Sequence, residues 1–208
     1  MRSLILQVAI FILCASSIKC LDLESAKELP CFPIHKTVPM EHDKSSDKPS
    51  GTARIYYPFM SRLDLYKSAT DILQKDPKEI SESTVYYDAC IVWTSNNGTH
   101  IAEGFDGHTR EYSIDVVKEG SNQVTKIHPV EGPGASGTGY VTLSDNKTFF
   151  FTAFCANDGQ MSWGVASLIP KLPEESVKKI HEHAVSLGFK KEYFTELRYD
   201  GCDLEHDE

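Results

Sequence analysis

The sequence has too few basic residues to suit a polyanionic partner. Its 21 lysines and arginines stand against 30 aspartates and glutamates, and the formal net charge is −9. Nucleic-acid phosphates and anionic membranes are bound by basic surfaces, so this composition argues against both. After residue 20, no stretch approaches the roughly 18 apolar residues of a transmembrane helix. The Gly-x-Ser-x-Gly nucleophile elbow is also missing. These absences predict a soluble protein that is not an enzyme, binds no nucleic acid and does not span a membrane.

What the sequence does contain is sufficient for a folded domain. Hydrophobic residues make up 40% of the 208 residues and charged residues 25%, and both fractions are typical of globular proteins. Since a domain commonly has about 100–200 residues, the length allows one domain or two small ones.

Residues 1–20, MRSLILQVAIFILCASSIKC, have the pattern of a secretory signal peptide, with Arg2 near the start and an apolar run over residues 4–13. Cleavage after Ser17 leaves five of the 6 cysteines, whereas cleavage after Cys20 leaves four, an even number that allows two disulfides. We favour the second site. The secreted, extracellular chain then has 19 basic and 30 acidic residues, a net charge of −11.

From residue 63 onward, short aromatic and β-branched runs alternate with turn signals. The predicted strands cover residues 63–73, 84–94, 99–105, 110–118, 123–130, 138–143, 148–156 and 161–169. Eight short strands at close spacing predict an antiparallel sandwich or an up-and-down barrel. Residues 21–62 are an N-terminal segment with a polar loop over 41–51, and residues 63–208 are the main folded unit.

One amphipathic helix follows the strands. It starts at Pro173 and ends near Gly188, and its apolar residues share one face, so we expect it to pack on the outside of the sheet. Two sequons, at Asn97 and Asn146, lie in turn-like stretches and are predicted glycosylation sites.

Several motifs suggest chemistry but have simpler interpretations. Residues 132–137, GPGASG, match a dinucleotide-binding pattern, yet a strand instead of a helix follows them, which favours a hairpin loop. His181 and His183 are two residues apart on the predicted helix, whereas a zinc-protease motif needs four, so they are interpreted as solvated. His108, at the start of a strand, is a weaker candidate for a haem ligand. The acidic face of this strand, with Glu111 and Asp115, would suit a cationic amine if it pointed inward. In a half-buried strand, however, the charged face usually points to solvent.

The order of about eight strands and one helix, together with the cysteine spacing, resembles the lipocalin superfamily. The stretch from Leu172 through Gly188 to Cys202 is similar to the helix, glycine stop and final cysteine of arthropod secreted and salivary lipocalins of the nitrophorin and triabin type, and of apolipoprotein D. The Gly-x-Trp signature is absent, and residues 63–65, LDL, stand near its place. The chain therefore resembles an outlier lipocalin over roughly residues 31–202.

The resemblance implies an eight-stranded antiparallel up-and-down β-barrel with one C-terminal helix outside it. It also implies the crossed disulfides Cys31–Cys155 and Cys90–Cys202. Such bridges should leave from the outer face of the barrel, and since side chains alternate along a strand, their neighbours then point inward. The candidate ligand-binding lining is Tyr87, Ile91, Trp93, Tyr112, Phe150 and Phe154.

The expected function is that of a secreted carrier or scavenger, a monomer that binds a small hydrophobic, amphipathic or cationic molecule inside the barrel and requires no cofactor. An alternative is a protein-binding inhibitor of host defence or haemostasis that uses its loops or acidic surface, as the likeness to salivary proteins implies. Haem binding through His108 is a weaker alternative.

Overall fold

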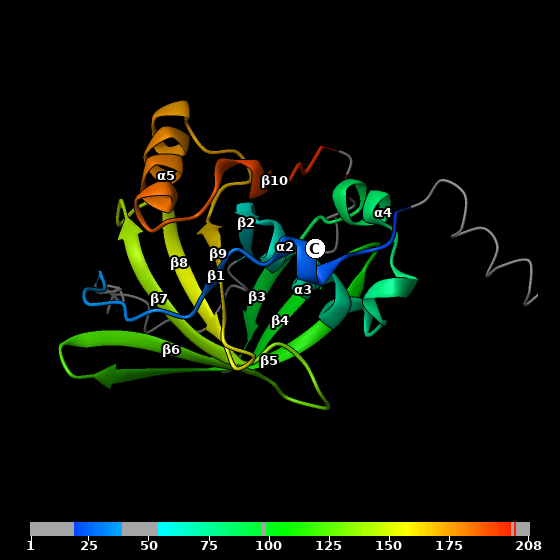
Figure 1. The fold of residues 1–208 in the computed structure, drawn as a ribbon, viewed down its shortest axis with the longest axis horizontal. Coiled ribbons are helices and arrows are strands. Elements are labelled where there is room, and N and C mark those ends of the chain that lie inside the picture. The colour runs from blue at the N-terminus through cyan, green and yellow to red at the C-terminus, as the bar shows by residue number, and fades with distance from the viewer. Residues whose placement is uncertain (1–18, 39–53, 97–98, 201, 203–208) are drawn as a thin grey trace, which may run out of the picture.

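In the computed structural model, which describes residues 19–38, 54–96, 99–200 and 202, eight antiparallel strands form a closed barrel (Figure 1). Each strand pairs with the next along the chain, and the last returns to the first through Phe59 opposite Val165 and Met60 opposite Gly164. The strands are β2 (Arg54–Ser61), β3 (Val92–Asn96), β4 (Thr99–Gly104), β5 (His108–Glu119), β6 (Asn122–Pro129), β7 (Gly137–Ser144), β8 (Phe149–Ala156) and β9 (Gln160–Ser167). This confirms the predicted eight-stranded antiparallel barrel.

Shorter elements surround the barrel. The strands β1 (Leu29–Pro30) and β10 (Phe194–Glu196) pair with β9 and β2. The helices are α2 (Leu23–Ala26), α3 (Arg62–Leu73), α4 (Glu82–Tyr87) and α5 (Glu174–Ser186), with 3-10 turns η1 (Pro77–Glu79) and η2 (Lys191–Tyr193). Within the described residues, no helix is long and apolar enough to cross a bilayer.

Helix α5 is the helix that the sequence predicts after the strands. Pro173 is its N-cap residue, and Gly188 follows its end with a φ of 97°. Ile180 and Ala184 are fully buried against the outer wall of the barrel, beside β8 and β9 (Figure 1). The predicted external position of this helix is therefore confirmed.

The prediction of a strand over residues 63–73 is wrong, because this segment is helix α3. The side chain of Ser61 accepts a hydrogen bond from the Asp64 backbone N–H at 3.2 Å, which caps the first turn. Its buried residues include Leu65, Ala69 and Ile72, at helical spacing. The alternation at its start, Leu63 and Leu65 around a polar residue, mimics a strand only locally.

The prediction of a strand over 84–94 is also wrong in its first half. Residues 82–87 form α4, capped by the Ser81 side chain, and the strand begins only at Val92. The first barrel strand, β2, lies ahead of residue 63 and contains Pro58. The proline is tolerated because it lies at a bulge, where the pairing of β2 with β9 shifts between Tyr56 and Phe59.

Two apolar layers hold these elements together. At one end of the barrel, Leu63, Tyr66 and Ile72 of α3 pack with Ile91 and Phe105. On the outer wall, the buried face of α5 packs on aromatic residues of β8 and β9. Helix α3 therefore covers one barrel end, whereas α5 covers one side.

The N-terminal segment fills a gap in the barrel wall. Strands β6 and β7 pair through three positions only, residues 125–127 with 137–139. Beyond them, Gln123 N–H donates to Thr37 Oγ1 at 3.1 Å, and Val38 N–H donates to the Val141 carbonyl at 2.8 Å. Residues 37–38 thus bridge the diverging strands. The predicted polar loop over 41–51 lies outside the described residues.

Candidate functional site: the barrel interior

The two faces of the barrel wall show an unusual pattern of burial. On β8, the outward-facing Phe149 and Phe151 are only 2% and 0% exposed, because α5 covers them. The inward-facing Phe150, between them in the sequence, and Phe154, three residues after Phe151, are only half-buried. In a solid core the inward side chains would be the better buried. The interior of the barrel therefore retains accessible surface.

The same partial burial extends around the barrel. Residues directly opposite each other on paired strands share a face, so the inward set can be read from the register. Phe154 lies opposite Gly139 and Ser162, and Thr152 lies opposite Val141 and Gly164. The half-buried inward residues are Ile55, Tyr57, Trp93, Ser95, His100, Ile114, Thr125, Ile127, Phe150, Thr152 and Phe154. The interior is mainly apolar and aromatic, with a few polar groups.

A buried polar cluster closes the barrel end beneath α3. The Asp71 carboxylate lies 3.4 Å from Arg110 Nε and accepts hydrogen bonds from the Tyr112 hydroxyl and, at 3.0 Å, from Ala135 N–H. Arg110 also donates to the carbonyls of Glu131 and Pro133, at 2.6 and 2.7 Å. Helix α3, strand β5 and the β6–β7 loop are thereby joined.

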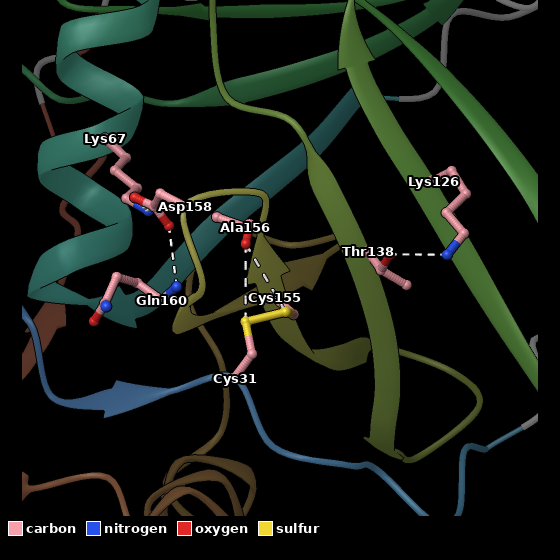
Figure 2. The surroundings of a disulfide bond; sticks show 8 residues. All are labelled: Cys31, Lys67, Lys126, Thr138, Cys155, Ala156, Asp158 and Gln160. Carbon is pink, nitrogen blue, oxygen red and sulfur yellow. Dashed lines mark hydrogen bonds and ion pairs between the residues drawn. A yellow bond between two sulfur atoms is a disulfide. The ribbon is translucent and has the colours of Figure 1, made fainter.

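A second contact fixes α3 one turn earlier. Lys67 Nζ lies 2.7 Å from Asp158 in the β8–β9 turn (Figure 2). A cleft of about 770 Å³ lies between α3 and the two loops, and Lys67, Asp71, Arg110 and Asp158 are among its lining residues. The middle and the last turn of α3 are thus held against the barrel rim.

Asp64, in the first turn of α3, places a carboxylate against the interior wall. Ser162 Oγ donates to its Oδ1 at 2.8 Å. Its Oδ2 lies 3.2 Å from the point that a Cβ at Gly164 would occupy, and the Tyr57 ring lies 3.6 Å from that point. Burial raises the pKa of Asp64 to about 6, against the opposing effects of Ser162 and Lys67. The carboxylate is mostly ionised at neutral pH.

A row of aromatic rings leads away from this carboxylate. The ring centroids of Tyr57 and Trp93 are 6.0 Å apart, and Trp93 stacks on Tyr112 at 4.8 Å with 18° between the ring planes. Burial, with the Asp64 charge as a second cause, raises the pKa of the Tyr57 hydroxyl. The site thus combines one acidic group with a continuous aromatic surface.

Four of the six predicted lining residues face the barrel interior. Trp93, Phe150 and Phe154 face the interior and keep accessible surface. Tyr112 also faces inward, but it is buried by its contacts with Asp71 and Trp93.

Two residues of the predicted lining do not fit a strand position. Ile91 is 1% exposed and belongs to the packed layer beneath α3. Tyr87 is the last residue of helix α4, so the period-2 argument that assigned it to the lining is wrong.

The histidines are distributed differently from the prediction. His108 is exposed at the rim, where its Nδ1 lies 2.7 Å from the Phe105 carbonyl, so its imidazole is not placed for a ligand in the interior. His100 is the histidine on the inward face, opposite Tyr112, and burial lowers its pKa. Glu111 and Asp115 point outward and are exposed, so the acidic face of this strand points to solvent as expected.

The interpretation of His181 and His183 as solvated residues is wrong. His183 packs on Phe151, with ring centroids 5.0 Å apart, and bonds to Thr142 Oγ1 at 2.8 Å. His181 packs on Phe59. Burial lowers the pKa of both imidazoles. They belong to the interface between α5 and the outer wall.

Both implied disulfides are present. Cys31–Cys155 ties the N-terminal segment to β8 (Figure 2), and Cys90–Cys202 ties the segment before β3 to the C-terminal tail. Two disulfides are typical of proteins from oxidising compartments. Cys20, next to the favoured cleavage site, forms a β-bridge with Ser81.

The two sequon asparagines have different positions. Asn146 is exposed in the β7–β8 turn, with a φ of 57°. Asn97 and residues 1–18 of the predicted signal peptide, which spans residues 1–20, lie outside the described residues.

Fold and site together define an up-and-down β-barrel with an accessible interior and one covered end. No protein-family model matches the sequence, and no curated protein matches it significantly. Among solved structures, apocrustacyanin C1 is 12% identical, with 78% of this chain and 87% of that chain covered and a TM-score of 0.43. Lobster apocrustacyanin A1 has the same identity and coverage with a TM-score of 0.44.

H1 crustacyanin from the lobster Homarus americanus is 10% identical over 73% of this chain and 78% of that chain, with a TM-score of 0.44. At these identities and TM-scores the likeness carries no argument about a ligand.

Asp64 and His100 are the site residues that sequence reasoning missed. The signal for Asp64 was Ser61-x-x-Asp64, a helix-capping pattern at the end of an aromatic run. For His100, the register of β4 against Tyr112 was needed, and no local pattern reveals it.

Proposed function

We propose that the protein is a secreted carrier or scavenger that holds one small hydrophobic or amphipathic molecule inside its barrel, in the manner of a lipocalin. The observation that supports this proposal is the half-burial of inward residues such as Phe150 and Phe154 beside fully buried outward ones. An eight-stranded barrel has room for one small ligand.

Binding energy would come mainly from apolar contact. Removing apolar surface from water contributes roughly 25 cal/mol per Å², and the interior presents aromatic and aliphatic side chains from β3, β5, β6 and β8. A few polar groups, among them Asp64 and Thr152, would orient the ligand. Secretion is part of the proposal and is supported by the two disulfides.

A neutral fluorescent probe tests the carrier function. N-phenyl-1-naphthylamine brightens in apolar surroundings, and we expect saturable binding of one probe per chain. Thr152 faces the interior opposite Gly164, so Thr152→Trp fills the space and weakens probe binding by about tenfold or more. The control is Thr109→Trp on the exposed outer face of β5, which changes affinity by less than about twofold.

Circular dichroism of both variants establishes that the barrel has formed. If Thr152→Trp does not fold, Phe150→Ala replaces it, and the loss of an inward ring is expected to weaken the probe. If the wild-type protein does not increase the fluorescence of the probe, the carrier proposal is refuted. That result would favour the alternative in which loops or the acidic surface inhibit a basic protein partner.

A further inference from the structure

The interior carboxylate of Asp64 forms no ion pair with any residue that the structure describes. Across the described part of the chain, no ion pair involves it, and its one side-chain hydrogen bond comes from Ser162. The lysine one turn along α3, Lys67, is engaged with Asp158 at 2.7 Å. Burying an ionised carboxylate without a compensating charge costs stability. A ligand that supplies the missing positive charge would offset this cost.

The groups around Asp64 suit an organic cation better than a metal ion. Its Oδ2 and the Tyr57 ring lie 3.2 and 3.6 Å from one shared point at Gly164, so carboxylate and ring border the same space. The Trp93 ring follows at 6.0 Å from Tyr57. Aromatic faces attract ammonium groups, and most strongly where water is excluded. In the described residues, no group of three or more metal-ligating side chains occurs.

We propose that the barrel binds an organic ammonium ion, with Asp64 as its counter-ion, Tyr57 and Trp93 beside the charged group, and the apolar body of the ligand among the inward phenylalanines of β8. This inference rests on the proposed carrier function and names its ligand class. It also excludes fatty acids and other carboxylates as preferred ligands at neutral pH, because their charge repels that of Asp64.

Three probes with one skeleton test the charge preference: 2-phenylethylammonium, the neutral 2-phenylethanol and the anionic phenylacetate. Isothermal titration calorimetry at pH 7.5 uses the full secreted chain with both disulfides. A hydrogen bond to a charged group contributes about 1.5–3 kcal/mol, so the ammonium ion should bind roughly tenfold to a hundredfold more tightly than the alcohol. Phenylacetate should bind most weakly.

Two carboxylate variants assign the preference to Asp64. Asp64→Asn removes the charge and keeps an oxygen for Ser162, so it should reduce ammonium affinity to that of the alcohol. Asp115→Asn makes the same change on the exposed outer face of β5 and should preserve the preference. A preference that survives Asp64→Asn, or its absence from the wild-type protein, overturns the inference.

A second pair of variants tests the aromatic contact. Tyr57→Phe keeps the ring and should retain the preference, whereas Tyr57→Leu should lower ammonium affinity several-fold more than alcohol affinity. Equal losses for both probes would contradict a role for the ring. If N-phenyl-1-naphthylamine binds but no ammonium preference exists, the counter-ion inference fails and the carrier function stands. If neither the fluorophore nor any of the three probes binds, both fail.

Discussion

Replacing Asp64 with asparagine should stabilise the ligand-free protein at neutral pH. Asparagine has nearly the same size and an oxygen that can accept the Ser162 hydrogen bond, but it carries no charge. Burial raises the pKa of Asp64 from 3.8 to about 6. The folded protein therefore holds the Asp64 proton more tightly than the unfolded chain does, and ionisation of the carboxylate costs folding free energy.

The size of the effect follows from the two pKa values. Below pH 3.8 the carboxyl group is protonated in both states and the substitution gains nothing from charge. Between pH 3.8 and about 6 the unfolded chain loses its proton first, so the wild-type protein loses stability as the pH rises. Above this range the loss reaches its full value, roughly 3 kcal/mol as an upper bound. In a chain of this size that corresponds to roughly 6–12 °C in Tm.

Other titrating groups near Asp64 do not mask this difference. Tyr57 from β2 and Tyr112 from β5 face it, and burial raises the pKa of both hydroxyls, which stay protonated throughout. Lys67 on α3 lies near Asp64 and is paired with Asp158. Burial lowers the pKa of the inward His100 on β4. Because wild type and variant share all these groups, subtraction of their unfolding free energies isolates the Asp64 charge.

Urea denaturation from pH 4 to 8 measures the difference, with Asp115→Asn as the exposed control. We expect a gain for Asp64→Asn that grows with pH and levels off above about pH 7, and no gain for the control. A gain of equal size at pH 4 and pH 7.5 would show that charge is not its cause. An Asp64→Asn protein less stable than wild type at pH 7.5 would refute the reasoning.

Three further predictions concern the fold around the site. Asp71→Ala leaves the buried Arg110 without its carboxylate partner and should cost about 3–5 kcal/mol in urea denaturation. Burial lowers the pKa of His183, so the neutral form favours folding and stability should fall as the pH drops below about 6.5; His183→Gln should flatten this dependence in acid melting curves. Loss of the Cys31–Cys155 bridge through paired alanine substitutions should cost about 2–5 kcal/mol, since the bridge spans 124 residues, and an unchanged urea midpoint would contradict it.

The barrel itself was largely predictable, because alternation and turn signals are local properties of the chain. Strands β4 to β9 agree with the predicted runs to within about two residues. Helix α5 was predictable from its proline start, glycine stop and apolar face. The signals for these elements lie within short stretches of the sequence, so the elements can be predicted without knowledge of tertiary contacts.

The segment between β2 and β3 was not predictable in this way. Leu63 and Leu65 satisfy a period of two as well as a helical period, and the Ser61 cap decides between them only once the chain turns there. The position of Asp64 in the interior depends on α3 lying across the barrel end, which is a tertiary arrangement. The same holds for Tyr87, whose assignment to the lining assumed a strand.

The contacts of α3 with Asp158 and Arg110 would govern ligand exchange in the proposed carrier. Both contacts must break before α3 can leave the barrel rim, so we expect passage of a ligand beneath α3 to be slow. At the other end of β5, Val116 is 46% exposed although it has the inward register of Ile114. A ligand that enters from that end would place its ammonium group against Asp64. The far end of its apolar body would then lie toward the open end of the barrel. The protein would then discriminate between ligands by the groups around the nitrogen, and the length of the apolar body would matter less.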